Sequence, residues 1–286
     1  MEKKRKREKK NEDEMEIEEE ENEIQFDINN NNNNNNELIN VEFTFSNIVE
    51  DNFQLIKVLI QPNFEFEDVY VGDLSDILIS QHEDVGTTIK VEENIFGVFS
   101  YIPISFYREK KLHKNFIEKF YKFLNNKIEK YCDNNKNKEN FLNILNNNNN
   151  NIGLVINERA MNLAEETIPP AMGLITKEIN ECKEMDDYDK RYDFDYFIIL
   201  SKFVKILDNK KHKKTNLDDN NNIAYYKFEY PLFLKKCLYN VEYKIPFEEK
   251  DMSIRENKNE PQFMSILIIE SDKYFKILKN ELNCEF

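Results

Sequence analysis

The sequence is poor in glycine, cysteine and histidine, with five, four and three of these residues among 286. No two glycines lie closer than eleven residues apart, so neither GxGxxG nor GxxxxGK[ST] occurs, and these phosphate-binding loops are excluded. The cysteines include no CxxC pair and the histidines are scattered, which argues against a zinc site or a disulfide framework. We therefore predict no metal-ligating and no cofactor-binding residues.

Long apolar runs are also absent. No run approaches the eighteen residues that a membrane-spanning helix needs, and the N-terminus does not resemble a signal peptide. Together with the isolated cysteines, this predicts a soluble protein of a reducing compartment, without membrane insertion. Apolar residues make up 40% of the chain and no Pro/Gly/Ser-rich linker divides it, so we expect one domain over residues 41–286.

The N-terminus carries a basic cluster followed by an acidic block at residues 12–23. Because residues 1–40 have few apolar side chains to bury, we predict that they are disordered. The basic cluster is a candidate nuclear localisation signal, and the alternative is a solubilising tail. The acidic block argues against direct nucleic-acid binding, because it repels phosphate. The basic residues are Lys3, Lys4, Arg5, Lys6, Arg7, Lys9 and Lys10.

Asparagine-rich stretches at residues 29–36, 146–151 and 218–222 are predicted to be exposed loops. Between them, hydrophobic periodicity predicts interspersed strands and helices, which indicates an α/β or α+β domain with a mixed sheet flanked by helices. Asp73 and Ser271 are predicted N-caps. The predicted strands are 41–46, 87–92, 95–103, 152–156, 194–204, 224–230, 238–245 and 263–269, and the predicted helices are 51–60, 73–81, 111–131, 169–183 and 271–282.

Seven segments spread over residues 41–282 resemble the BCCIP family. In chain order they are VEFTF, DNFQLIKVLI, LSDILISQHEDVGTTIK, IFGVFSYI, GLVINERAMN, IPPAM and FDYFIIL. The chain departs from the family pattern after Asn162, where five residues delay the expected proline until Pro169. This departure puts the local loop geometry in question and leaves the resemblance intact.

The resemblance implies a nuclear, non-enzymatic protein-binding factor that shuttles to the cytoplasm. Family members in fungi act as a chaperone for a large-subunit ribosomal protein and in the nuclear export of a lipid kinase. Animal members bind a recombination mediator and a cyclin-dependent-kinase inhibitor. The expected partners are therefore a basic ribosomal protein and nuclear transport or regulatory factors, and the alternative is a regulator of the cell cycle or of DNA repair.

The family fold is similar to that of GCN5-related acetyltransferases, so an enzyme is a further alternative. Those enzymes hold acetyl-CoA with backbone N–H groups of a Q/R-x-x-G-x-G/A turn. The nearest match here is QHEDVGTT at residues 81–88, where Gln81 is too far from Gly86 and Thr88 replaces a small residue. Glu83 and Asp84 would also repel a phosphate. We expect an acetyltransferase-like fold with no cofactor site, no catalytic residues and no small-molecule substrate.

Residues 58–89 contain no Lys or Arg, whereas seven of them are acidic. One interpretation is an ordinary solvated face, and the other is a docking surface for a basic client, which it would attract and whose charges it would mask. Residues 1–28 carry seven basic and twelve acidic side chains, so −10 of the net charge of −15 lies on the rest of the chain. The candidate docking residues are Glu65, Glu67, Asp68, Asp73, Asp76, Glu83 and Asp84.

Two further groups of residues allow a functional and a structural interpretation. Glu158 and Arg159 form either a recognition pair or, more in keeping with a strand end, a charge pair that fixes the following loop. The aromatic residues Tyr225, Tyr226, Phe228 and Tyr230 either stack on nucleobases or pack in the core. Their alternation and acidic neighbours favour packing.

Overall fold

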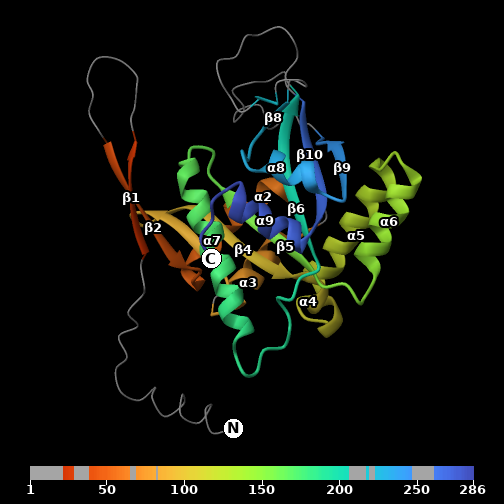
Figure 1. Cartoon of the computed structure of the whole chain (residues 1–286), viewed down its shortest axis with the longest axis horizontal. Coiled ribbons are helices and arrows are strands. Elements are labelled where there is room, and N and C mark those ends of the chain that lie inside the picture. Colours follow the sequence, from red (N-terminus) through yellow and green to blue (C-terminus); the bar gives the residue numbers. More distant parts are fainter. Residues whose placement is uncertain are drawn as a thin grey trace.

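Figure 1 shows the computed structural model, which describes residues 22–28, 39–64, 69–81, 83–205, 217–218, 223–246 and 261–286. Among these residues ten strands form one open sheet, in which the path β1-β2-β3-β4-β5-β6-β10-β9 is joined by β8 and β7 beside β6. The strands are β1 (Asn22–Ile28), β2 (Ile39–Asn47), β3 (Thr87–Val91), β4 (Asn94–Pro103), β5 (Ile152–Arg159), β6 (Tyr196–Lys205), β7 (Leu217–Asp218), β8 (Ile223–Tyr225), β9 (Tyr239–Lys244) and β10 (Gln262–Glu270).

The sheet is mostly antiparallel, and only β5 and β6 run parallel to each other. These two strands pair over three positions, from Ile152 opposite Tyr196 to Leu154 opposite Ile198. Beyond them β5 continues along β4, whereas β6 continues along β10. The predicted mixed sheet is thus confirmed. Because β5 and β6 separate after these three paired positions, a gap opens between the two parallel strands.

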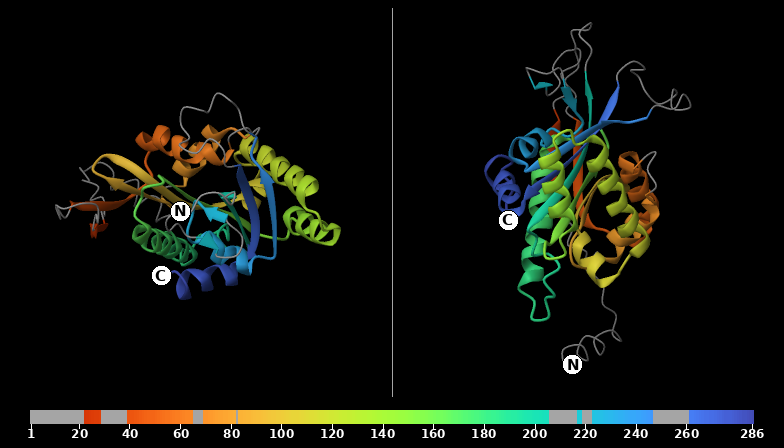
Figure 2. Two further views of the ribbon diagram at one scale, coloured as in Figure 1. Left: turned by 90° about the horizontal axis from the view of Figure 1, so that it is seen from above. Right: turned by 90° about the vertical axis from the view of Figure 1, so that its right-hand side faces the viewer.

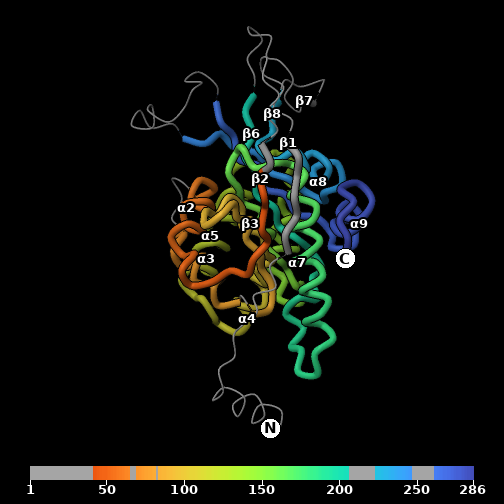
Figure 3. Tube along the Cα trace, turned by 90° about the vertical axis from the view of Figure 1, so that its left-hand side faces the viewer, coloured from red at the N-terminus to blue at the C-terminus, as the bar shows by residue number. Residues whose placement is uncertain are grey.

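Helices cover both faces of the sheet, which makes three layers (Figures 2 and 3). On one face α2 to α6 enclose a core of aliphatic and aromatic side chains, and on the other face α7, α8 and α9 enclose a second core. The helices are α2 (Phe53–Phe64), α3 (Val71–Ser80), α4 (Ile104–Lys110), α5 (Lys114–Tyr131), α6 (Asn135–Asn146), α7 (Ile168–Lys183), α8 (Tyr230–Lys236) and α9 (Ser271–Asn280), with single 3-10 turns η1 (Glu50–Asn52) and η2 (Glu165–Thr167).

Most predicted elements are confirmed, and the exceptions have local causes. The predicted helix 111–131 begins only at Lys114, because Lys111 and His113 adopt positive φ angles of 56° and 48° and separate α4 from α5. The predicted strand 224–230 ends at Tyr225, and α8 begins at Tyr230 with a proline in its first turn. Helix α6 was not predicted, because few of its residues are apolar.

Both predicted N-caps are wrong. Asp73 lies inside the first turn of α3, whose cap position is Tyr70, and Ser271 is the first residue of α9 after Glu270. Neither cap residue makes a side-chain capping hydrogen bond. In these two helices tertiary packing replaces local capping, since helix stability in proteins comes mainly from the buried face.

Several predictions concern residues outside the described ranges. These include the basic cluster, residues 12–21 of the acidic block and the asparagine stretches at 29–36 and 219–222. Within the predicted N-terminal tail, residues 22–28 form β1 and pair with β2. The asparagines at 146–151 form the end of α6 and the exposed turn before β5, as predicted.

Candidate functional site

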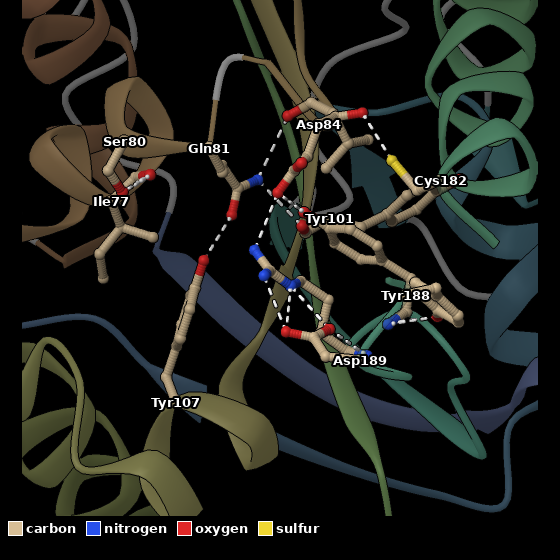
Figure 4. Close-up of polar contacts among 12 residues, drawn as sticks. Ile77, Ser80, Gln81, Asp84, Tyr101, Tyr107, Cys182, Tyr188 and Asp189 are labelled. Carbon is tan, nitrogen blue, oxygen red and sulfur yellow. Dashed lines mark hydrogen bonds and ion pairs between the residues drawn. The ribbon is translucent and has the colours of Figure 1, made fainter. Parts of the chain in front are cut away.

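The 81–86 turn, which joins α3 to β3, is fastened to the sheet by the side chain of Gln81. This side chain is 2% exposed, and its Nε2 donates to Ser100 Oγ at 2.6 Å and to the Tyr101 carbonyl at 3.0 Å. Its Oε1 accepts from the Tyr107 hydroxyl of α4 at 3.2 Å (Figure 4). The turn is therefore a structural joint between β4, α3 and α4.

The backbone N–H of Gly86 is already hydrogen-bonded within the protein. Its φ angle is +147°, which only glycine adopts readily, and a Cβ atom here would lie 2.7 Å from the Ile48 side chain. The Gly86 N–H donates to Glu178 Oε2 of α7 at 2.9 Å. Burial raises the pKa of Glu178 to about 7, although the hydrogen bond from Gly86 opposes this shift. A carboxyl group thus occupies the donor that a phosphate would need.

Asp84 is neutralised by a cation from the loop after α7. Arg191 Nη1 lies 2.9 Å from Asp84 Oδ2, and the same oxygen accepts from the Tyr192 hydroxyl at 3.2 Å. The guanidinium also binds Asp189 and lies over the ring of Phe106, 5.4 Å from its centroid. Its hydrogen bond lowers the pKa of Asp189. Asp84 therefore connects the 81–86 turn to the loop after α7, and its role in client docking stays a prediction.

The other predicted docking residues divide into two groups. Glu65, Glu67 and Asp68 lie outside the described residues. Asp73, Asp76 and Glu83 are at least partly exposed, and none of them forms a salt bridge with another residue of the described ranges. Within the described residues, three of the seven carboxylates therefore lie at the surface without a salt bridge.

Asp73 and Asp76 line an open hollow of about 210 Å³ together with His113 and Lys114. Burial lowers the pKa of His113, while the two carboxylates act in the opposite direction. No group of three or more His, Cys, Asp or Glu side chains within the described part of the chain is arranged to hold a metal ion.

Glu158 and Arg159 each form a buried ion pair, but not with each other. Lys227 Nζ lies 2.8 Å from Glu158 Oε1 and donates to the Leu200 carbonyl at 3.3 Å, so it fills the gap between β5 and β6. Arg159 binds both oxygens of Glu229, at 2.9 and 2.8 Å. The predicted charge pair that fixes the loop after β5 is therefore wrong, because both side chains bind residues of the segment before α8.

The Glu229 carboxylate is deeply buried, and its environment keeps it charged. Burial alone would raise its pKa, but Arg159 lowers it, and Asn157 Nδ2 donates to it at 2.7 Å. A small cavity of about 10 Å³ lies beside it, which is room for one water molecule. The site between the parallel strands is therefore filled by protein groups.

The aromatic residues at 225–230 mainly pack. The ring of Tyr225 lies 5.6 Å from Phe203 and 5.7 Å from Tyr230, and Tyr230 is fully buried. Tyr226 is 39% exposed, and its hydroxyl accepts from Gln262 at 2.9 Å. Packing is confirmed for the buried rings, and they form no open stacking platform.

Sequence reasoning missed Glu178, Arg191 and Lys227. Each lies on a segment remote in sequence from its partner: Glu178 is 92 residues from Gly86, and Arg191 is 107 residues from Asp84. No local pattern signals such pairs, because only the tertiary fold brings them together. No helix of the described residues is long and apolar enough to cross a bilayer.

Comparisons with known proteins agree on one family. A family model described as BCCIP matches residues 38–263. The protein bcp-1 of Neurospora crassa is 26% identical over 198 residues, which cover 66% of this chain and 64% of that protein. The bovine BRCA2 and CDKN1A-interacting protein is 22% identical over 260 residues, covering 85% of this chain and 82% of that protein.

The fold is shared with a solved structure. The crystal structure of BCP1 from Saccharomyces cerevisiae superposes with a TM-score of 0.58 and 16% sequence identity, covering 87% of this chain and 90% of that one. The likeness to acetyltransferases that the sequence suggested is not shown. In this chain the turn at Gly86 leads into strand β3 and not into a helix.

Proposed function

The chain belongs to the BCCIP family, and from this premise we propose that it is a non-enzymatic nuclear protein-binding factor. Its client in this proposal is a basic protein of the large ribosomal subunit, which it chaperones during assembly or nuclear export. The bovine relative is named for its interaction with two other proteins, which supports a role in protein binding.

One observation carries the choice of a basic client. Asp73, Asp76 and Glu83 remain without salt bridges in the described residues, in a stretch of the sequence that has no Lys or Arg from residue 58 to residue 89. Unpaired surface carboxylates accelerate the encounter with a cationic protein and shield its charges from RNA. The acidic block at residues 12–23 adds negative charge to the same chain.

Charge reversal tests this function. The chain with Asp73→Lys, Asp76→Lys and Glu83→Lys would be titrated into fluorescently labelled, purified large-subunit ribosomal proteins at several salt concentrations. We expect a loss of affinity of about tenfold or more and a shallower salt dependence, because three attractive charges are inverted. Unchanged affinity and salt dependence would show that this surface does not capture the client.

A matched control carries the same change of net charge elsewhere. The substitutions Glu92→Lys, Glu93→Lys and Glu166→Lys alter three exposed carboxylates on the β3–β4 turn and on η2. This variant should retain most of the affinity if the location of the charges matters. Equal losses in both variants would indicate a response to net charge alone.

A second candidate function is the regulation of cell-cycle or DNA-repair proteins, which the printed name of the bovine relative favours. Affinity purification from nuclear extract, with mass spectrometry of the bound proteins, distinguishes the two. Ribosomal proteins among the specific partners support the chaperone function, whereas recovery of only repair or cell-cycle factors supports regulation.

The absence of catalysis is part of the proposal. It is supported by the Gly86 N–H, which donates to Glu178 in the turn that most resembles a coenzyme loop. Calorimetry with acetyl-CoA tests it, and micromolar binding would favour the acetyltransferase alternative. Nuclear import is tested by deleting residues 3–10, after which we expect nuclear accumulation to fall.

A further inference from the structure

Helix α2 carries apolar side chains on two opposite sides. Its inner side packs Ile56, Ile60 and Phe64 into the core, where they are almost completely buried. On its outer side Leu55 is 43% exposed and Val58 is 66% exposed. A surface helix normally presents polar residues to water, so neighbouring exposed apolar residues on one side make that side a candidate contact surface.

The exposed outer residues form a stripe, which consists of Leu55, Val58 and Pro62; Leu59 beside them is partly buried against the core. Their spacing of i, i+3 and i+7 places them on one side of the helix over a length of about 10 Å, or two helical turns. Pro62 has no N–H, so the Val58 carbonyl lacks its usual helical donor. The stripe thus has an apolar surface and one backbone acceptor.

Helix α5 provides the contrast, because it packs against the same face of the sheet. Its outer positions include the exposed residues Lys114, Glu118, Lys122 and Lys130, which suit contact with water. The apolar outer side of α2 is therefore not a general property of this layer.

The exposed charges at the start of the stripe are negative. Glu50 and Asp51 are exposed directly before α2, whereas Asp73 and Asp76 of the neighbouring helix α3 lie beside His113 and Lys114. The one basic residue of α2, Lys57, lies over the ring of Tyr70 at 5.7 Å from its centroid. A ligand for this surface needs an apolar ridge with cationic groups at its margins.

We propose that the outer stripe of α2 binds an amphipathic segment of a partner protein, with apolar residues against Leu55 and Val58 and Lys or Arg residues beside the flanking carboxylates. A helix of two or three turns matches the length of the stripe. The positive charge of the partner rests on the proposed function, while the apolar contact follows from α2 alone.

Charge makes the other occupants less suitable. A second copy of this chain would bring its own Glu50 and Asp51 and a net charge of −15 to the same surface. Nucleic acids and anionic lipids are negatively charged, so the same carboxylates would repel them. Neither of them combines the apolar ridge with the positive charge that this surface requires.

A defined peptide tests the stripe without knowledge of the client. The probe is a fluorescently labelled peptide of 18 leucine and lysine residues, with all leucines on one helical face. Its control is a scrambled peptide of the same composition. The length of the probe is about that needed for a stable short helix. The full chain with Leu55→Ser and Val58→Ser should bind the probe at least about tenfold more weakly than the unchanged chain, because buried apolar anchors dominate such interfaces.

Matched variants control for exposed apolar residues in general. Met161→Ser and Met185→Ser remove side chains that are also largely exposed, and they should leave probe binding unchanged. Equal binding of the scrambled peptide, or an unchanged affinity of the Leu55→Ser and Val58→Ser variant, would overturn the proposal. A lower unfolding midpoint of that variant would also overturn it, because the stripe would then be covered by the chain itself.

Two further measurements separate this inference from the proposed function. A dimer of the unchanged chain in light scattering, lost on Leu55→Ser and Val58→Ser, would identify a second copy as the occupant and overturn the assignment. If ribosomal proteins bind both chains equally while the charge-reversed variant fails to bind them, the proposed function stands and the stripe proposal falls. If the probe binds through the stripe but no ribosomal protein binds, the proposed function falls and the stripe remains.

Discussion

The two faces of the sheet differ in where charged groups lie. On the face of α7, α8 and α9, a charged pair is buried, as in the Arg159–Glu229 ion pair, beside neutral hydrogen bonds such as that between Tyr101 and Thr176. On the face of α2 to α6, buried polar groups such as Gln81 and Tyr107 are neutral, and a charged group such as Asp76 stays at the surface without a salt bridge to any described residue.

This difference separates structural charges from charges that remain available to a partner. A buried ion pair satisfies its members internally, and removing one member leaves a desolvated charge. An exposed, unpaired carboxylate contributes little to stability and keeps its field in the solvent. Substitutions of the buried charges on the first face should therefore change stability, whereas substitutions of the exposed carboxylates on the second face should change binding.

The largest effect is expected from Arg159→Ala. It leaves the Glu229 carboxylate buried without its cation and should lower the free energy of unfolding by about 3–5 kcal/mol in urea titrations. Arg159→Met combined with Glu229→Leu should lose less than the single variant, because no unpaired charge remains. A loss below about 1 kcal/mol for Arg159→Ala would mean that water solvates this pair.

Within α2, substitutions on the inner and outer sides compare the stability contributions of buried and exposed side chains. Ile56→Ala removes a fully buried side chain and should cost about 3 kcal/mol, whereas Leu55→Ala should change stability by less than about 0.5 kcal/mol. Chemical denaturation of both variants measures the difference. Similar costs at the two positions would mean that both sides of the helix are buried.

Glu178 predicts a pH dependence of stability. Its pKa is raised from 4.5 to about 7 in the folded chain, so the folded state binds this proton more tightly than the unfolded state. The resulting penalty is absent below about pH 4.5, grows as the pH rises and is complete above about pH 7, where it amounts to about 1–3 kcal/mol.

Glu178→Gln removes this ionisation and keeps an acceptor for the Gly86 N–H. The variant should therefore be more stable than the unchanged chain at pH 8, and this advantage should shrink as the pH is lowered toward 5. Urea titrations across this range measure it. A constant difference between the two proteins at all pH values would contradict the shifted pKa.

The smallest effect distinguishes two carboxylates of the acidic stretch. Asp84→Asn weakens the contact with Arg191 and should cost about 1 kcal/mol, whereas Asp76→Asn should leave stability unchanged within about 0.5 kcal/mol. Thermal unfolding at equal concentration checks both. Equal effects would mean that Asp84 is as available to a client as Asp76.

The sequence alone predicted the strands and helices whose hydrophobic periodicity is clear. The alternation of VEFTF predicted β2, and the helical spacing of Phe116, Phe120 and Leu124 predicted α5, because these patterns bury one side in the core. It failed at Tyr225–Tyr230, where alternation continues into a turn and a helix. A short pattern of this kind does not distinguish a strand from the start of α8.

The candidate site was predictable only in part. The composition identified the acidic stretch, but it did not distinguish Asp84, which Arg191 neutralises, from Asp76, which forms no salt bridge with any described residue. The outer stripe of α2 is readable in the spacing of Leu55, Val58 and Pro62. Its exposure is not, because burial depends on which elements pack against each side of the helix.

The sequence by itself determined the charge balance, the scarcity of glycine and the family resemblance, since these depend only on residue identity and order. The tertiary structure decided which charges are neutralised, which apolar sides are covered and what fills the gap between β5 and β6. The reason is physical: hydrophobic periodicity acts over a few neighbouring residues, whereas ion pairing and burial depend on segments that are distant along the chain and meet only in the folded protein.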